Sequence, residues 1–180
     1  SDWGADAIRV GIGGGSICST RIQTGHGMPT LQSVLDCSDS EFAGSVAIIA
    51  DGGIKNSGDI VKALGAGADF VMVGSLLAGT TESPGEVITK DSGSFKVYRG
   101  MASKDAQINW RGHTASIEGV TSTVPYKGRV STVVEELSTG IRSGLSYSGC
   151  KNLKEFQSRC TFIGQSSVGA HESSTHIMNR

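Results

Sequence analysis

Three short glycine clusters are the parts of this sequence best suited to binding an anion. Residues 13–16, 52–53 and 74–75 each follow a short apolar run. Backbone N–H groups at such turns, aided by the N-termini of the helices that follow, bind phosphate groups. Each cluster alone could also be a tight turn between a strand and a helix. Because the same context recurs three times, we predict a single phosphate held by several loops.

Two side chains next to these clusters are candidates for chemistry and for substrate binding. Cys18 follows the first cluster and lies three residues before the cationic Arg21. A thiol near a helix start or a cation ionises more readily and becomes a nucleophile, although a single cysteine is often only a small buried apolar residue. Asp51 precedes Gly52 and Gly53, where its carboxylate could accept two hydrogen bonds from a ribose or could cap a helix.

The remaining cysteines and the histidines predict no metal site. The four cysteines are scattered without a CxxC spacing, and the four histidines lack the spacing of metal ligands. We therefore assign a packing role to Cys37, Cys150 and Cys160.

Strands and helices must alternate in the first part of the chain to position these residues. Apolar runs at 7–10, 45–50 and 69–73 are typical of parallel strands buried on both faces. Between them, helical spacing of apolar residues covers 30–42 and a segment that starts at Ser57, the predicted N-cap. This order predicts an α/β fold whose ligands bind at the carboxyl ends of the strands.

The pattern changes after residue 78. The stretch 86–128 is predicted to be a flap-like excursion: it opens with a hairpin, and from residue 100 it is polar with little periodicity. Apolar spacing then predicts two helices, and the end of the chain is rich in Ser, Gly and His and is predicted to be irregular. The predicted hairpin strands are 87–89 and 95–98, the helices are 130–147 and 151–160, and the irregular tail starts after 164.

Three parallel strands are too few for a closed (β/α)₈ barrel, which needs eight strands and at least about 200 residues. The chain has 180 residues and opens on Ser1, directly before a strand-like run. We therefore expect residues 1–180 to form a single domain that is a portion of a larger fold.

Composition excludes several classes of function. The net charge is −1, so no basic surface predicts nucleic-acid binding. No apolar run approaches the roughly 18 residues of a membrane span, and no secretory leader is apparent. With scattered cysteines, these features predict a cytoplasmic protein with reduced thiols and no membrane partner.

An ordered set of motifs resembles the IMP dehydrogenase/GMP reductase family. GIGGGSICSTR at 11–21 resembles the family's cysteine loop, and ADGGI, VMVGSLLAGTTESPGE, YRGMAS and VPYKG follow in the family's order and at similar spacing. The segment 140–156 resembles the family's closing part. The resemblance implies the C-terminal portion of a (β/α)₈ TIM barrel, with about three βα units, a flap and closing helices.

The same resemblance implies a role for each matching position. Cys18 would attack C2 of a purine nucleotide and form a covalent thioimidate, while Thr20 would assist proton transfer. Asp51 would bind the ribose, and Gly100 and Met101 would contact the base. The 5′-phosphate would be bound by Ser16, Gly53, Gly74, Ser75 and Tyr98, and Gly52 is a further predicted substrate-binding residue. Backbone carbonyls of Gly13, Gly15 and Cys18 would hold a monovalent cation, K⁺. Position 14 is Gly where the family usually has Pro, so this loop is expected to be looser.

The direction of the reaction is predicted from positions in 86–128 that differ from the motifs of each branch of the family. Dehydrogenases of the family carry an Arg-Tyr pair there, whereas Arg111 is followed by Gly112, and Thr121 replaces their base-reading Glu. Both departures resemble GMP reductases, which convert GMP to IMP with NADPH. However, the Glu of the reductase motif GMSSE is here Lys104, with Asp105 next to it as a possible substitute. The closing GAHESSTHI at 169–177 instead resembles the tail of dehydrogenases.

We therefore favour NADPH-dependent reductive deamination of GMP, with NAD-dependent oxidation of IMP to XMP as the alternative. The resemblance also implies a homotetramer. Two readings without this chemistry stay open: a non-catalytic nucleotide-binding half-barrel, and an unrelated phosphate-binding barrel, such as a flavin-dependent one, in which Cys18 has no special role.

Overall fold

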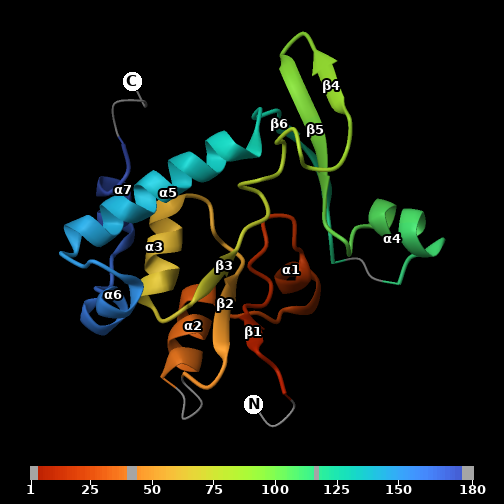
Figure 1. The fold of residues 1–180 in the computed structure, drawn as a ribbon. Coiled ribbons are helices and arrows are strands. Elements are labelled where there is room, and N and C mark those ends of the chain that lie inside the picture. The colour runs from red at the N-terminus through yellow and green to blue at the C-terminus, as the bar shows by residue number, and fades with distance from the viewer. Residues whose placement is uncertain (1–3, 40–43, 116–117, 176–180) are drawn as a thin grey trace.

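A computed structural model describes residues 4–39, 44–115 and 118–175 (Figure 1). Its first half contains a parallel sheet of three strands in the order β1 (Ala7–Val10), β2 (Ala47–Asp51) and β3 (Phe70–Met72). All three predicted parallel strands are therefore confirmed. Since the strands run in the same direction, the glycine clusters that follow them emerge at one edge of the sheet.

Helices α2 (Thr30–Ser38) and α3 (Ser57–Gly65) pack against one face of this sheet. The core between them includes Val34 and Ala50, which are fully buried, and Ile60. The N-cap of α3 is Asn56 and not the predicted Ser57, because the backbone of Asn56 is extended and its side chain accepts a hydrogen bond from the N–H of Asp59. The predicted helix 30–42 ends at Ser38, and residues 40–43 lie outside the described part.

The opposite face of the sheet is uncovered in the described residues. Phe70 is 60% exposed and Met72 is 43% exposed, although parallel sheets of whole domains are covered on both faces. Register places Phe70 opposite Ile49 and Met72 opposite Asp51. Asp51 therefore points to the uncovered face, which corresponds to the interior of a barrel.

The second sheet is an antiparallel ribbon of β4 (Val87–Lys90), β5 (Gly93–Arg99) and β6 (Thr121–Pro125), which stands away from the parallel sheet (Figure 1). The predicted hairpin is confirmed. Within 100–128, predicted to be a polar excursion with little periodicity, the structure has two regular elements, α4 (Lys104–Arg111) and β6. Helix α4 starts at the cap Ser103 and ends at Gly112, whose φ of 75° is left-handed.

The remaining helices are α1 (Thr20–Thr24), α5 (Val130–Tyr147), α6 (Leu153–Arg159) and α7 (Ser167–Glu172). The long α5 lies across α3 at close approach, since a Cβ on Gly140 would be 2.1 Å from Ser57 Oγ. The prediction of an irregular tail is wrong for α7, and the five-residue α1 was not predicted. Among the described residues, no helix is both long and apolar enough to cross a membrane.

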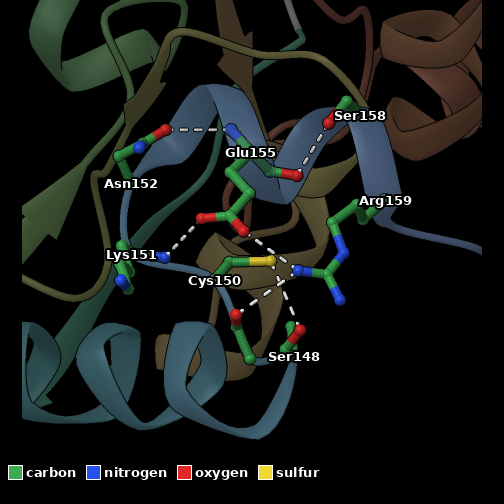
Figure 2. A network of polar contacts seen from close by, with 8 residues as sticks. Ser148, Cys150, Lys151, Asn152, Glu155, Ser158 and Arg159 are labelled. Atoms are coloured by element: carbon green, nitrogen blue, oxygen red, sulfur yellow. Dashed lines mark hydrogen bonds and ion pairs between the residues drawn. The ribbon is translucent and has the colours of Figure 1, made fainter.

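A polar network fixes the start of α6 (Figure 2). The side chain of Asn152 accepts a hydrogen bond from the N–H of Glu155 at 2.9 Å. The Glu155 carboxylate in turn accepts from the N–H of Lys151 at 2.9 Å and pairs with Arg159 at 3.0 Å. These reciprocal bonds satisfy backbone donors that the first helical turn leaves open.

Candidate active site

The first two glycine clusters are in direct contact. A Cβ on Gly52, whose φ is 98°, would lie 2.8 Å from the backbone carbon of Gly14. A Cβ on Gly14 would lie 2.6 Å from Thr30 Oγ1. These approaches leave no room for side chains at Gly14 and Gly52, so the cysteine loop packs against the second cluster. That Gly14 makes this loop looser than the family's stays a prediction.

The third cluster meets the first at the hydroxyl of Tyr98. Tyr98 Oη lies 3.3 Å from Ser16 Oγ, and a Cβ on Gly74 would be 3.1 Å from the same oxygen. The structure therefore brings together Ser16, Gly74 and Tyr98 from the cysteine loop, the end of β3 and strand β5. Two hydroxyl groups beside a glycine turn are the donor types that bind a phosphate.

Cys18 begins a short chain of hydrogen bonds. Its Sγ lies 3.1 Å from Thr20 Oγ1, to which it donates, and Thr20 Oγ1 donates to Glu118 Oε2 at 2.6 Å. The thiol is half-buried and not disulfide-bonded. A thiol, a hydroxyl and a carboxylate in series can carry a proton away from the sulfur and return it.

Glu118 is the site residue that sequence reasoning missed. It stands 98 positions after Thr20, so only the folded chain brings the two together. Its backbone is held by the cysteine loop: the N–H of Ser19 donates to the Glu118 carbonyl at 2.9 Å, and the N–H of Val120 donates to the Ile17 carbonyl at 3.0 Å. The only available signal was its place at the start of EGVTSTVPYKG.

The segment around Gly119 is wedged between the cysteine loop and the start of α4. A Cβ on Gly119 would lie 2.4 Å from the backbone nitrogen of Ser103. Gly100 donates its N–H to the Val120 carbonyl at 3.3 Å, and a Cβ there would be 3.3 Å from Ile17 Cδ1. Gly100 and the exposed Met101 therefore lie beside the loop that carries Cys18.

Asp105 lies in the first turn of α4 and is exposed. Among the hydrogen bonds of the described residues, none joins Asp105 to Cys18 or Thr20, and Glu118 makes the contact to Thr20 instead. Asp105 therefore makes no hydrogen bond to Cys18 or Thr20 among the described residues, and its role toward a departing amino group stays a prediction.

Asp51 is held by Arg9 on the uncovered face of the parallel sheet. Arg9 Nη1 lies 2.6 Å from Asp51 Oδ2, and the Asp51 side chain is 26% exposed. A carboxylate has several acceptor positions, so this ion pair orients Asp51 and leaves it able to accept further hydrogen bonds.

The predicted cation ligands belong to one turn. The N–H of Cys18 donates to the Gly15 carbonyl at 3.1 Å, and Gly13 lies against the side chain of Arg21. Backbone carbonyl oxygens are ligands that suit potassium, so the donor chemistry fits this ion. Within 4–39, 44–115 and 118–175, no cluster of His, Cys, Asp and Glu could hold a metal.

Comparisons with known proteins all identify the same family. Residues 1–176 match the model of the IMP dehydrogenase/GMP reductase domain. The chain is 48% identical to inosine-5′-monophosphate dehydrogenase of Nitrosopumilus maritimus, covering 96% of this chain and 39% of that protein. It is 43% identical to GMP reductase of Leishmania major, covering 99% and 38%. The chain thus spans about two fifths of the length of these relatives.

A solved structure shows the same fold. GMP reductase from Trypanosoma brucei, a cysteine-to-alanine variant in complex with guanosine 5′-monophosphate, superposes with a TM-score of 0.91 at 45% identity. The match covers 97% of this chain and 37% of that one. It confirms the prediction that the chain is an α/β portion of a (β/α)₈ barrel.

Proposed function

Because the chain belongs to the IMP dehydrogenase/GMP reductase family, we propose that it carries the nucleotide-binding face and the nucleophile of a GMP reductase. The observation that carries this proposal is the hydrogen-bonded series Cys18–Thr20–Glu118, with distances of 3.1 and 2.6 Å. The series starts in the loop after β1, which also carries the first glycine cluster. A nucleotide anchored there by its phosphate would present its base to Cys18.

The nucleotide is held at three points. The 5′-phosphate lies between Ser16 and Tyr98. Its oxygens accept hydrogen bonds from backbone N–H groups of the glycine turns at 52–53 and 74–75. Arg9 orients the Asp51 carboxylate toward the ribose hydroxyls, as their 2.6 Å ion pair supports. Gly100 and Met101 contact the base, which is consistent with their position beside Ile17.

The first chemical step forms a bond between Cys18 Sγ and C2 of GMP and breaks the bond between C2 and the amino group. The thiol proton passes through Thr20 to Glu118, and Glu118 delivers it to the departing amino group, so that ammonia leaves. The product is a thioimidate on Cys18. General acid–base assistance of this kind contributes about 10²–10⁴-fold to a rate.

The second step regenerates the thiol. When bound, NADPH would supply the hydride that C2 receives. As the C2–S bond breaks, the sulfur leaves with the electron pair. Glu118 takes up a proton from solvent and passes it through Thr20 to the sulfur. IMP is released, and Cys18 is again a thiol. The carbonyls of Gly13, Gly15 and Cys18 would hold K⁺ and fix the shape of the cysteine loop.

The absence of an Arg-Tyr pair from residues 100–118 favours reduction over dehydrogenation. Oxidation of IMP needs an activated water to hydrolyse the thioimidate, whereas reduction of GMP needs a proton for the amino group, and Glu118 bonded to Thr20 suits that task. Oxidation of IMP to XMP with NAD is the second candidate, since a relative named as the dehydrogenase is 48% identical.

Two parallel assays on the full-length polypeptide encoded by its gene separate these functions. Loss of NADPH absorbance with GMP supports the reductase, and formation of NADH with IMP supports the dehydrogenase instead. Binding of both nucleotides without either turnover would overturn the enzymatic proposal in favour of a nucleotide-binding fragment. Cys18→Ala is the control, because it removes the nucleophile and leaves the phosphate-binding residues in place.

A further inference from the structure

Lys96 is a buried cation with no carboxylate partner among the contacts of the described residues. It lies on β5, is 3% exposed, and its Nζ donates to the backbone carbonyls of Thr80 at 3.1 Å, Thr81 at 3.3 Å and Ser83 at 2.6 Å. An ammonium group has three donors, so these carbonyls use all of them. Burying a cation is costly unless its donors are satisfied, and the loop must therefore keep this shape.

The same loop begins with the third glycine cluster and is held a second time near its start. Lys127 Nζ donates to the carbonyls of Ser75 at 2.8 Å and Leu76 at 3.2 Å. Backbone bonds lie between the two lysines, since Lys127 N–H donates to the Gly79 carbonyl at 2.8 Å. The loop of residues 74–83 is thus fastened along its length to the β5–β6 ribbon.

Tyr98, whose hydroxyl faces Gly74, lies on the same strand as Lys96. Residues two apart on a strand lie on the same face, so Lys96 and Tyr98 both point toward the loop. Gly74 is close enough to Tyr98 that an added Cβ would be 3.1 Å from its hydroxyl oxygen. The bonds of Lys96 to the loop therefore set the spacing between the Tyr98 hydroxyl and the turn at Gly74.

We infer that Lys96 and Lys127 are positioning residues that lock loop 74–83 onto the ribbon and thereby shape the phosphate site between Gly74, Ser75 and Tyr98. This inference rests on the proposed function, because it takes a nucleotide 5′-phosphate as the ligand of that site. Both lysines act through carbonyl groups of the loop and leave the phosphate to backbone N–H groups and hydroxyls.

The test compares affinities for a nucleotide and its nucleoside in the full-length polypeptide. Isothermal titration gives the ratio of Kd for guanosine to Kd for GMP, and inosine with IMP serves as a second pair. Lys96→Met keeps the volume of the side chain and removes its ammonium. Lys127→Met does the same at an exposed position where loss of folding is not expected. Lys90→Met, on exposed β4 with its ammonium over the Phe95 ring, is the matched control.

We expect each of the two positioning variants to lower this ratio by about tenfold or more, with nucleoside binding almost unchanged and KM raised more than kcat is lowered. Lys90→Met should leave the ratio at the wild-type value. A wild-type protein that binds guanosine as tightly as GMP would overturn the proposed function itself. A wild-type preference for GMP that persists in Lys127→Met, and in Lys96→Met where it folds, would overturn the inference alone.

Discussion

Glu118→Gln removes the ability of the side chain to accept a proton and leaves its structural contacts in place. Glutamine keeps the length of the side chain and can still contact Thr20 Oγ1, which lies 2.6 Å from Glu118 Oε2, but an amide cannot take up a proton. The backbone at 118–120 is held by bonds from Ser19 and to Ile17 that do not involve this side chain. The variant should therefore fold and bind nucleotide like the wild type.

The expected loss follows from the position of Glu118 at the end of the series. If proton transfer from Cys18 passes through Thr20 to Glu118, removing the acceptor lowers kcat by about 10²–10⁴-fold, the usual contribution of general acid–base catalysis. Because the two groups act in one series, Thr20→Val with Glu118→Gln should be no slower than the slower single variant.

The assay is steady-state oxidation of NADPH with saturating GMP, together with the ammonia released. Glu86→Gln, at an exposed position before β4, is the matched control and should retain wild-type kcat. The reasoning is refuted if Glu118→Gln keeps kcat within about threefold of wild type, or if the losses of the two single variants multiply in the double variant.

Two further perturbations test the packing around the site and the start of α6. Gly119→Ala places a Cβ 2.4 Å from the Ser103 backbone nitrogen. This overpacking should lower the free energy of unfolding by about 1–3 kcal/mol, measured by denaturant titration, and should also lower kcat. An unchanged free energy of unfolding and kcat would contradict the close packing of Gly119 against Ser103. The pKa of Glu155 is lowered by the hydrogen bond from the Lys151 N–H and, in addition, by Arg159 (Figure 2). A folded pKa below the unfolded one means that the Glu155 carboxylate stabilises the protein above the unfolded value of about 4.3 and loses this effect as pH falls through the folded value. Glu155→Gln should thus melt earlier than wild type at neutral pH, the two melting curves should converge in acid, and a constant difference across pH would contradict the assignment.

Local sequence patterns were sufficient for the elements that carry the glycine clusters. Short, mostly apolar runs predicted all three parallel strands, and helical spacing predicted α3 and α5, with α5 at the bounds found in the structure. Cys18 and Asp51 could be singled out because each adjoins a glycine turn. These signals come from residues near one another in the chain, so a single sequence is enough to detect them.

Features that depend on distant partners could not be predicted. The hydrogen bond between Thr20 and Glu118 joins residues far apart in the chain, and β6 exists only because it pairs with β5. Helix α4 has eight residues and is polar overall, so it has few apolar residues from which a helix could be predicted. Its caps at Ser103 and Gly112 were further local signals. The three carbonyl contacts of Lys96 likewise follow from the path of the loop and from no motif.

The central claim is that Cys18 forms a covalent bond with a purine nucleotide during turnover. The most direct measurement mixes the full-length polypeptide with radiolabelled GMP or IMP and the matching cofactor, quenches in acid, and locates the label by peptide mass spectrometry. We predict label on the peptide that contains Cys18, and neither label nor turnover in Cys18→Ala. Turnover that survives in Cys18→Ala, or label on another residue, would contradict the claim.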